Sequence, residues 1–214
     1  MIRMGTTRKR KLEQLRICLE NDVQARTVKT GFDDIQLVHR CLPGVDPEDV
    51  DTSTRFLGRE FHAPLFISAM TGGVQESAAI NANLAEAVEK LKIGMCLGSQ
   101  RAGVEDSSLE YTYKVAREKA PSAFLSANLG ISEILRYGPE KVMKTVEMVD
   151  ADALTIHLNP LQELLQSDGG GTSSGAVKKV AEVARYAKVP VIVKETGAGV
   201  SREDALIMKE LGVT

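Results

Sequence analysis

Four polar side chains gather within seven consecutive positions that follow an apolar run: His157, Asn159, Gln162 and Glu163. An imidazole can exchange a proton near neutral pH, and a carboxamide can both donate and accept hydrogen bonds. Side chains alternate along a strand, so His157 and Asn159 would point to the same side, and the turn at Pro160 would bring the next two over the strand end. A lone buried histidine is usually structural, but four such residues after a buried strand predict a functional polar site.

Polar or glycine-rich residues also follow four other apolar runs. They are Thr71-Gly72-Gly73, Ser99-Gln100-Arg101, Asn128-Leu129-Gly130 and Lys194-Glu195. The glycine pair would let backbone amides approach a flat ring or an anion, although a tight turn gives the same pattern. Arg101 suits phosphate oxygens or is simply a surface arginine, and Asn128 can equally be a helix cap. Lys194 follows apolar residues and, if buried, needs an anionic or electron-rich partner.

Short apolar runs alternate with longer stretches of helical period, which predicts strands followed by helices. The predicted strands cover Leu65–Met70, Gly94–Gly98, Ala123–Leu129, Ala153–Leu158 and Pro190–Glu195. The predicted helices cover Glu76–Leu91, Leu109–Lys119, Pro139–Val149, Gly175–Ala187 and Arg202–Leu211. Ser201 and Gly212 are the expected caps of the last helix. Runs that are apolar throughout indicate a parallel sheet covered on both faces, as in an α/β fold.

Both a doubly wound sheet and a (β/α)8 barrel contain this repeat. A barrel gathers the C-terminal ends of all its strands around one mouth, whereas an open sheet binds ligands mainly where its strand order reverses. Because every predicted strand ends in polar or small residues, we favour the barrel. We expect an N-terminal extension over residues 1–60, with a basic start and a helix near Leu12–Glu20. Residues 61–214 would form an incomplete (β/α)8 barrel of five βα units, with a sixth strand due at 212–214, as the first part of a longer protein.

The composition is that of an ordinary globular protein. Its 27 basic and 29 acidic residues leave a net charge of -2, so no overall field favours nucleic acid or an anionic membrane. Cys18, Cys41 and Cys96 share no metal-binding or redox spacing, which predicts a reducing compartment and small buried side chains. The N-terminus lacks the apolar core of a signal peptide, and no apolar run reaches the ~18 residues of a membrane span. We therefore expect a cytoplasmic protein.

In combination and order, several segments resemble type 2 isopentenyl-diphosphate isomerases, most closely the archaeal members. They are Arg10-Lys11-Leu12-Glu13, Met70-Thr71-Gly72-Gly73, Gly98-Ser99-Gln100-Arg101, Asn128-Leu129-Gly130, His157 to Glu163, and Lys194-Glu195 with Gly197 and Gly199. The resemblance covers essentially all of residues 1–214. It implies a barrel that binds FMN at its mouth and interconverts isopentenyl and dimethylallyl diphosphate with reduced flavin and Mg²⁺. NAD(P)H would be the reductant, and the expected state is a homo-tetramer or larger oligomer.

The resemblance also implies a role for each matching residue. The flavin would be lined by Met70, Thr71, Ser99, Asn128 and Lys194. The substrate would be held by Arg10, Lys11, Ser99, Arg101, His157, Asn159 and Gln162. The catalytic residues would be Gln162, His157 and Lys194, and Glu163 would approach a metal that bridges diphosphate oxygens. The basic residues near the N-terminus would then be diphosphate ligands, or else a solvated basic start.

Moving a double bond adds a proton at one carbon and removes one at another, with no net redox change. Gln162 is a neutral carboxamide and by itself a poor acid or base. We therefore hypothesise that a ring nitrogen of the reduced flavin moves the proton, with Gln162 orienting it and His157 and Lys194 tuning the local charge.

Two positions depart from the family pattern. Gln14 stands where the family usually has a histidine, and because it cannot carry charge it would weaken the hold on the diphosphate. Ser167–Gly175 is rich in glycine and serine where the family usually continues with Pro-Glu-Gly-Asp, and we predict a flexible loop.

Two alternatives stay open. Another FMN barrel, such as a 2-hydroxy-acid oxidase or dehydrogenase, would also use a lysine and a strand-end histidine, but it gives no reason for the pair Gln162 and Glu163. A truncated, non-catalytic half-barrel is the second, because the late loops that commonly hold the FMN phosphate lie outside residues 1–214. For the same reason we expect this chain alone to bind FMN weakly or not at all.

Overall fold

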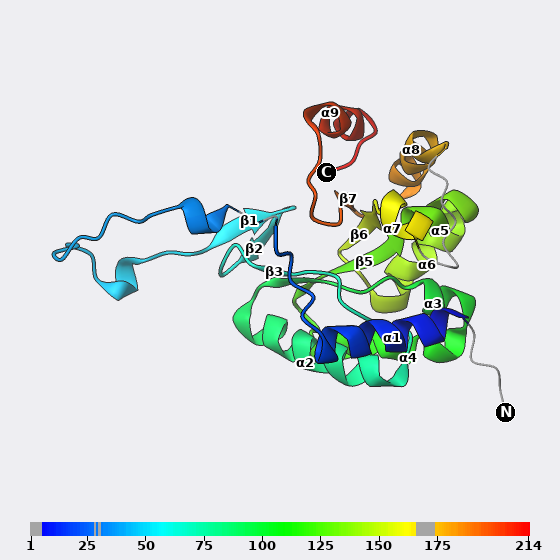
Figure 1. Cartoon of the computed structure of the whole chain (residues 1–214), viewed down its shortest axis with the longest axis horizontal. Coiled ribbons are helices and arrows are strands. Elements are labelled where there is room, and N and C mark those ends of the chain that lie inside the picture. The colour runs from blue at the N-terminus through cyan, green and yellow to red at the C-terminus, as the bar shows by residue number, and fades with distance from the viewer. Residues whose placement is uncertain (1–5, 28, 30, 166–173) are drawn as a thin grey trace.

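The computed structural model describes residues 6–27, 29, 31–165 and 174–214. Its centre is a sheet of five parallel strands: β3 (Phe66–Ile67), β4 (Gly94–Cys96), β5 (Phe124–Gly130), β6 (Ala153–His157) and β7 (Val191–Lys194). The strands pair in the order in which they occur along the chain (Figure 1). Because the strand order never reverses, right-handed connections carry the helices to one face, and the sheet curls into a half-barrel. The predicted α/β barrel class is confirmed.

Every helix predicted after a strand is present. The observed bounds are α2 (Gln75–Leu91), α4 (Tyr111–Lys119), α6 (Pro139–Val149), α8 (Ala176–Tyr186) and α9 (Arg202–Glu210). Both predicted caps of α9 are confirmed, because the Ser201 hydroxyl accepts from the Asp204 amide at 3.0 Å and Gly212 has a left-handed φ of 81°. Within the described part of the chain, no helix is long and apolar enough to cross a bilayer.

Three short helices, which the sequence did not predict, follow the ends of strands. They are α3 (Arg101–Glu105), α5 (Ile131–Arg136) and α7 (Pro160–Leu165). Five or six residues are too few to reveal a helical period in the sequence. Short 3-10 helices occur at Phe32–Asp34, Pro47–Asp49 and Ser107–Leu109. Of the loop predicted to be flexible, residues 167–173 lie outside the described residues.

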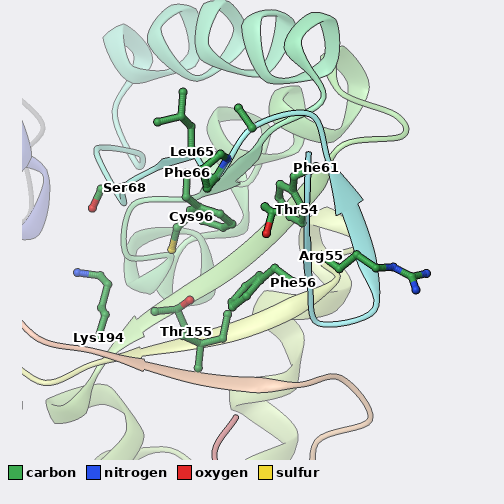
Figure 2. Close-up of a pocket in the computed structure, with 13 residues that line it drawn as sticks. Thr54, Arg55, Phe56, Phe61, Leu65, Phe66, Ser68, Cys96, Thr155 and Lys194 are labelled. Carbon is green, nitrogen blue, oxygen red and sulfur yellow. The ribbon is translucent and has the colours of Figure 1, made fainter. Parts of the chain in front are cut away.

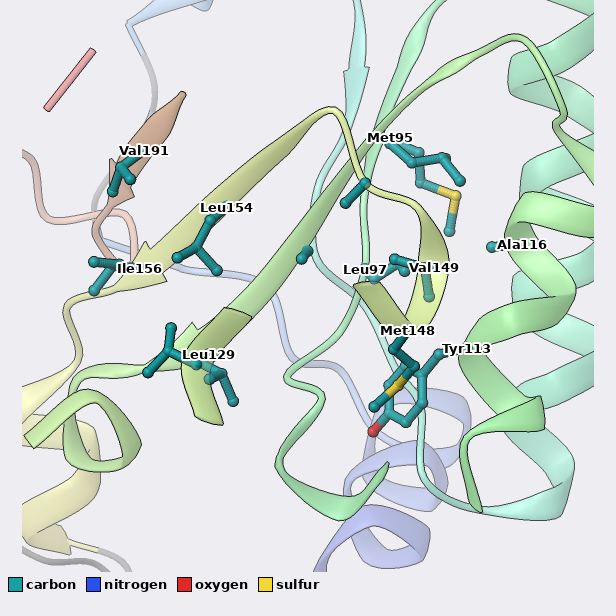
Figure 3. Packing of buried hydrophobic residues seen from close by; sticks show 14 of the residues in the cluster. Met95, Leu97, Tyr113, Ala116, Leu129, Met148, Val149, Leu154, Ile156 and Val191 are labelled. Atoms are coloured by element: carbon teal, nitrogen blue, oxygen red, sulfur yellow. The ribbon is translucent and has the colours of Figure 1, made fainter. Parts of the chain in front are cut away.

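Alternate strand residues point away from the concave side and pack against the helices. On β5 and β6 these outward residues are fully buried: Leu125, Ala127, Leu129, Leu154 and Ile156. Figure 3 labels the last three of them. They share one apolar cluster with Val88 of α2 and Val142 of α6. Burial of apolar surface stabilises a fold by about 25 cal/mol per Å², so this layer is the main hydrophobic core.

The remaining strand positions face the concave side and change character along the barrel axis. Near the N-terminal ends of the strands, Phe124 packs on Phe61 with ring centroids 5.6 Å apart. In the middle, the hydroxyl oxygens of Ser126 and Thr155 lie 2.6 Å apart. At the C-terminal ends the concave positions are Asn128, His157 and Lys194. The concave side therefore runs from an aromatic floor to a polar mouth.

The N-terminal region forms a helix and a hairpin. Helix α1 spans Thr6–Glu20, so it begins earlier than the predicted Leu12. Strands β1 (Thr54–Phe56) and β2 (Arg59–Phe61) pair antiparallel. Phe56 and Phe61 of this hairpin pack against Phe66 and Phe124, which closes the floor of the half-barrel. The predicted boundary at residue 60 falls inside β2.

The expectation that the cysteines are buried was wrong for two of them. Cys96 is buried on β4, whereas Cys18 and Cys41 are exposed. Both exposed cysteines lie in the N-terminal region that precedes the barrel strands, Cys18 on α1.

Gly98 lies where the chain after β3 passes close to the end of β4. A Cβ at Gly98 would lie 2.4 Å from the backbone oxygen of Thr71, which cannot move aside as a flexible side chain can. We expect Gly98→Ala to lower the free energy of unfolding by about 1–3 kcal/mol, as overpacking does, in urea denaturation. In the control Gly138→Ala, the nearest atom to the added Cβ is a mobile Glu140 carboxylate oxygen at 3.0 Å. Equal losses in both variants would contradict the tight packing at Gly98.

Candidate active site at the mouth of the half-barrel

The three residues predicted to be catalytic line one cavity of about 660 Å³ at the C-terminal ends of the strands. His157 and Lys194 are direct neighbours in the register of β6 and β7, and Gln162 reaches the cavity from α7. Ser68, Glu195 and Thr196 complete the polar part of the lining. The structure thus brings together side chains from three separate elements.

A second cavity, of about 490 Å³, continues from the mouth into the concave interior. Lys194 and Ser68 line both cavities, and Cys96 and Thr155 lie deeper (Figure 2). Below them the walls are mostly apolar, with Phe66 among the floor residues. The mouth therefore has a polar rim above an apolar interior, as small-molecule binding sites often do.

His157 is held in its neutral form. Burial is the main reason that its pKa falls to about 4, and the nearby charge of Lys194 adds to the effect. Among the residues that the structure describes, none hydrogen-bonds the buried Nε2 of His157. A neutral imidazole with an uncommitted nitrogen can donate to or accept from a ligand in the mouth.

We expect the C2 proton resonance of His157 to titrate near pH 4 in an NMR pH titration. The unfolded chain protonates this histidine at its ordinary value of 6.5, so the unfolded state gains protons first as the pH falls. The stability that His157 contributes is therefore complete above about pH 6.5 and is lost as the pH falls toward 4. A midpoint near 6.5 in the folded protein would contradict this environment.

Lys194 is a partly buried cation. Burial lowers its pKa, while the Cys96 thiol and the Glu195 carboxylate act in the opposite direction. Glu195 itself caps the following turn, because its Oε2 accepts from the amides of Gly197, Ala198 and Gly199 at 2.7, 2.6 and 3.0 Å. The Glu195 carboxylate is committed to this turn, which leaves the ammonium of Lys194 facing the cavities.

The Asn159–Glu163 segment forms a hydrogen-bonded cluster at the start of α7. The side-chain nitrogen Nδ2 of Asn159 donates to Gln162 Oε1 at 3.2 Å and to Glu163 Oε1 at 3.1 Å. Ser132 of α5 donates to the other oxygen of Glu163 at 3.3 Å. Asn159 and Glu163 are buried, so Gln162 is the member of the cluster that reaches the cavity.

The residues predicted to line the flavin lie at the ends of β3, β4, β5 and, for Lys194, β7. Asn128 is buried, and its amide nitrogen donates to the Leu97 carbonyl at 2.9 Å. Its Oδ1 has no hydrogen-bond partner in the described residues and could accept from a ligand. Thr71 is buried, Ser99 is half-buried and Met70 is exposed. These side chains lie at the same end of the half-barrel as His157 and Lys194.

Gln100 has a structural role that its strand-end position did not reveal. Its Oε1 accepts from the Asn128 amide at 3.0 Å, and its Nε2 donates to the Thr145 carbonyl at 2.8 Å. Tyr113 donates to the Ser99 carbonyl at 2.8 Å beside it. These three hydrogen bonds fix the loop after β4, which carries Ser99 and leads into α3.

The predicted substrate cations Lys11 and Arg101 come together although 90 positions separate them in the sequence. Both are buried. The pKa of Lys11 falls to about 8, mainly because of burial; the charges of Arg10 and Arg101 contribute to this fall, and Glu133 opposes it. Arg101 Nη1 lies 3.0 Å from Glu133 Oε1. A cluster of cations thus surrounds one carboxylate.

Glu133 and Ser132 are the residues that sequence reasoning missed. Both lie on α5, the short helix directly after the Asn128-Leu129-Gly130 strand end. An acidic residue three positions after that motif was the available signal, but without the predicted helix nothing placed it beside Arg101.

Comparisons with known proteins agree with this geometry. The model of a family described as FMN-dependent dehydrogenase matches residues 6–124. Proteins named isopentenyl-diphosphate delta-isomerase are 46% identical over 99% of this chain in Methanosarcina acetivorans, and 52% identical over 96% in Methanothermobacter thermautotrophicus. The one in Archaeoglobus fulgidus is 49% identical over 98%. The chain spans 58%, 57% and 60% of the length of these three relatives, in the order in which they are named.

A solved structure shares the fold. It is a Pediococcus acidilactici protein described as a lactate oxidase, with a TM-score of 0.54 and 13% sequence identity, and the match covers 76% of this chain and 48% of that chain. The family match covers more than half of the residues, and the relatives carry the name that the sequence motifs indicated. The chain therefore belongs to the FMN-dependent dehydrogenase family, among homologues named isopentenyl-diphosphate delta-isomerase.

Proposed function

We propose that the protein interconverts isopentenyl and dimethylallyl diphosphate with reduced FMN and Mg²⁺, with NAD(P)H as the reductant, and works in the cytoplasm as a homo-oligomer. The observation that carries this proposal is the pairing of two features at one end of the half-barrel. One is the mouth cavity with His157, Gln162 and Lys194, and the other is the buried cation cluster of Lys11 and Arg101. A proton-handling site next to cations suits an apolar substrate with a diphosphate group.

The strand-end residues fit a flavin. Met70, Thr71, Ser99, Asn128 and Lys194 would hold it, and the unpartnered Oδ1 of Asn128 gives a buried acceptor for a ring N–H. Reduced flavin supplies a ring that can exchange a proton with the substrate without net oxidation. The chain's own contribution is to orient that ring against the cavity and to keep water out of the apolar interior.

The diphosphate would be held by Arg10, Lys11 and Arg101, with Ser99 and Asn159 as hydrogen-bonding partners. Among the described residues, no three histidine, cysteine or acidic side chains gather as metal ligands. Mg²⁺ commonly uses one or two carboxylates together with substrate phosphates, so Glu163 alone suits a metal that arrives with the diphosphate.

At the end of the site where the double bond moves, the neutral His157 and Gln162 would hold the hydrocarbon part of the substrate in a fixed position next to the flavin ring. Lys194 would stabilise negative charge beside the site. The interaction between its ammonium group and that charge is stronger at a partly desolvated site than in water. The apolar cavity below the mouth would bind the hydrocarbon part of the substrate.

The decisive assay incubates the purified protein with dithionite, Mg²⁺, isopentenyl diphosphate and a large excess of FMN, because weak FMN binding is expected for this chain. We expect dimethylallyl diphosphate to form with no net oxidation of the flavin, as followed by the flavin absorbance. Flavin reduction by a 2-hydroxy acid, with no isomerisation, would instead indicate an oxidase or dehydrogenase. A folded protein that turns over neither substrate would indicate a non-catalytic half-barrel.

A further inference from the structure

Glu133 is a buried carboxylate with two arginine partners. Its side chain is 4% exposed. Its Oε1 lies 3.0 Å from Arg101 Nη1 and 3.1 Å from Arg136 Nη2. Arg101 is itself 10% exposed on its side chain, whereas Arg136 is 57% exposed. The Arg101–Glu133 contact is therefore a buried ion pair, and Arg136 is a second, solvent-exposed partner of Glu133.

The cations around Glu133 include those proposed to hold the diphosphate. Arg10 and Arg101 both act to lower the pKa of Lys11, which shows mutual repulsion within the cluster, and Glu133 acts to raise it. Removing charges from water is costly unless an opposite charge compensates them. In the empty protein, Glu133 supplies that compensation for Arg101 and Lys11.

Glu133 also lies beside the polar cluster of α7. A Cβ built on Gly130 would lie 2.8 Å from Glu133 Oε2 and 3.8 Å from Asn159 Oδ1, so both oxygens approach the same point at the end of β5. Ser132, the preceding residue, donates to Glu163 at 3.3 Å. The carboxylate thus lies between the cation cluster and the substrate-facing residues.

We propose that Glu133 is a positioning residue that acts as a resident counter-anion of the diphosphate site, holding Arg101 and Lys11 when the site is empty and competing with the diphosphate for them. This inference rests on the proposed function, which places the diphosphate at these cations. Glu133 therefore lowers ground-state affinity for the substrate while it keeps the cations in place.

The direction in which Glu133→Gln changes the affinity for diphosphate distinguishes this role from a purely structural one. Glu133→Gln keeps a side-chain oxygen that can accept from Arg101 but removes the negative charge. If Glu133 competes with the diphosphate, this variant binds diphosphate more tightly. If Glu133 only maintains the shape of the site, the variant binds it equally or more weakly.

The test measures the Kd of inorganic pyrophosphate by titration calorimetry, without added metal, for the wild-type protein and three variants. We expect Glu133→Gln to bind about tenfold more tightly, the effect of a modest change in charge interaction, with a steeper loss of affinity as salt increases. Glu133→Asp keeps the charge and should stay near the wild-type Kd. Glu105→Gln is the matched control, because Glu105 lies 3.9 Å from Arg101 and is 41% exposed.

Unchanged or weaker binding by Glu133→Gln, or no pyrophosphate binding by any form, would overturn the inference. If Glu133→Gln is unfolded alone, pyrophosphate should restore its circular dichroism, because a ligand that binds only the folded state stabilises it, and failure to do so counts against the inference. The isomerase assay reports separately on the proposed function. Tighter pyrophosphate binding without turnover of isopentenyl diphosphate would sustain the counter-anion role and reject the isomerase.

Discussion

Arg101→Met is expected to lower the free energy of unfolding by about 3 kcal/mol or more, measured by urea denaturation, because it leaves Glu133 as a buried charge that has lost one of its two partners. The same change should abolish measurable pyrophosphate binding, since it removes the guanidinium next to Lys11. Both losses come from one buried side chain, which the sequence suggested as a phosphate ligand or a surface arginine.

A double-mutant cycle tests the cause of this loss. Replacing both partners, as Arg101→Met with Glu133→Met, should recover much of the stability, because buried ion pairs are often no better than apolar residues of similar size. Arg16→Met is the control: Arg16 pairs with Glu20 at 2.8 Å, but the two side chains are 75% and 56% exposed, and such pairs contribute about 1 kcal/mol or less. An Arg101→Met loss no larger than that of Arg16→Met would contradict a buried, coupled pair.

Lys194→Met is expected to lower kcat for isomerisation by about 100-fold with the fold intact, since removing one preorganised charge or donor beside a reacting centre typically has this effect. Methionine keeps much of the length and volume of the lysine side chain, so the cavities should keep their shape. The second consequence is electrostatic. Because the charge of Lys194 helps to depress the pKa of His157, the variant should raise that pKa above its value of about 4.

The two readouts are measured on the same protein, by product formation and by NMR titration of His157. Lys188→Met is the matched control, because Lys188 is exposed and lies just before β7, at the end of that strand opposite Lys194. A variant with wild-type kcat and an unchanged His157 titration would show that Lys194 does not act on the mouth. A raised pKa with unchanged kcat would keep the electrostatic contact and reject the catalytic role.

The repeating part of the fold could be predicted because each step depends on neighbours in the chain. Runs such as Leu125–Leu129 are recognised as strands because their outward residues are apolar and an inward residue such as Ser126 is small. The Ser201 and Gly212 caps depend only on local backbone geometry. Strand ends such as His157 and Lys194 could be placed at one mouth because parallel strands in a barrel end on the same side.

The tertiary structure alone decided which polar groups meet. The helix that carries Glu133 is too short to leave a periodic signal, and the electrostatic influence of Arg101 and Glu133 on Lys11 depends on where α1 packs. The low pKa of His157 likewise required knowledge of its burial and of Lys194 on the next strand. Local patterns thus determined the strands, helices and strand-end residues of this protein, while the charge state and partners of its site followed from packing between distant segments, which no local pattern encodes.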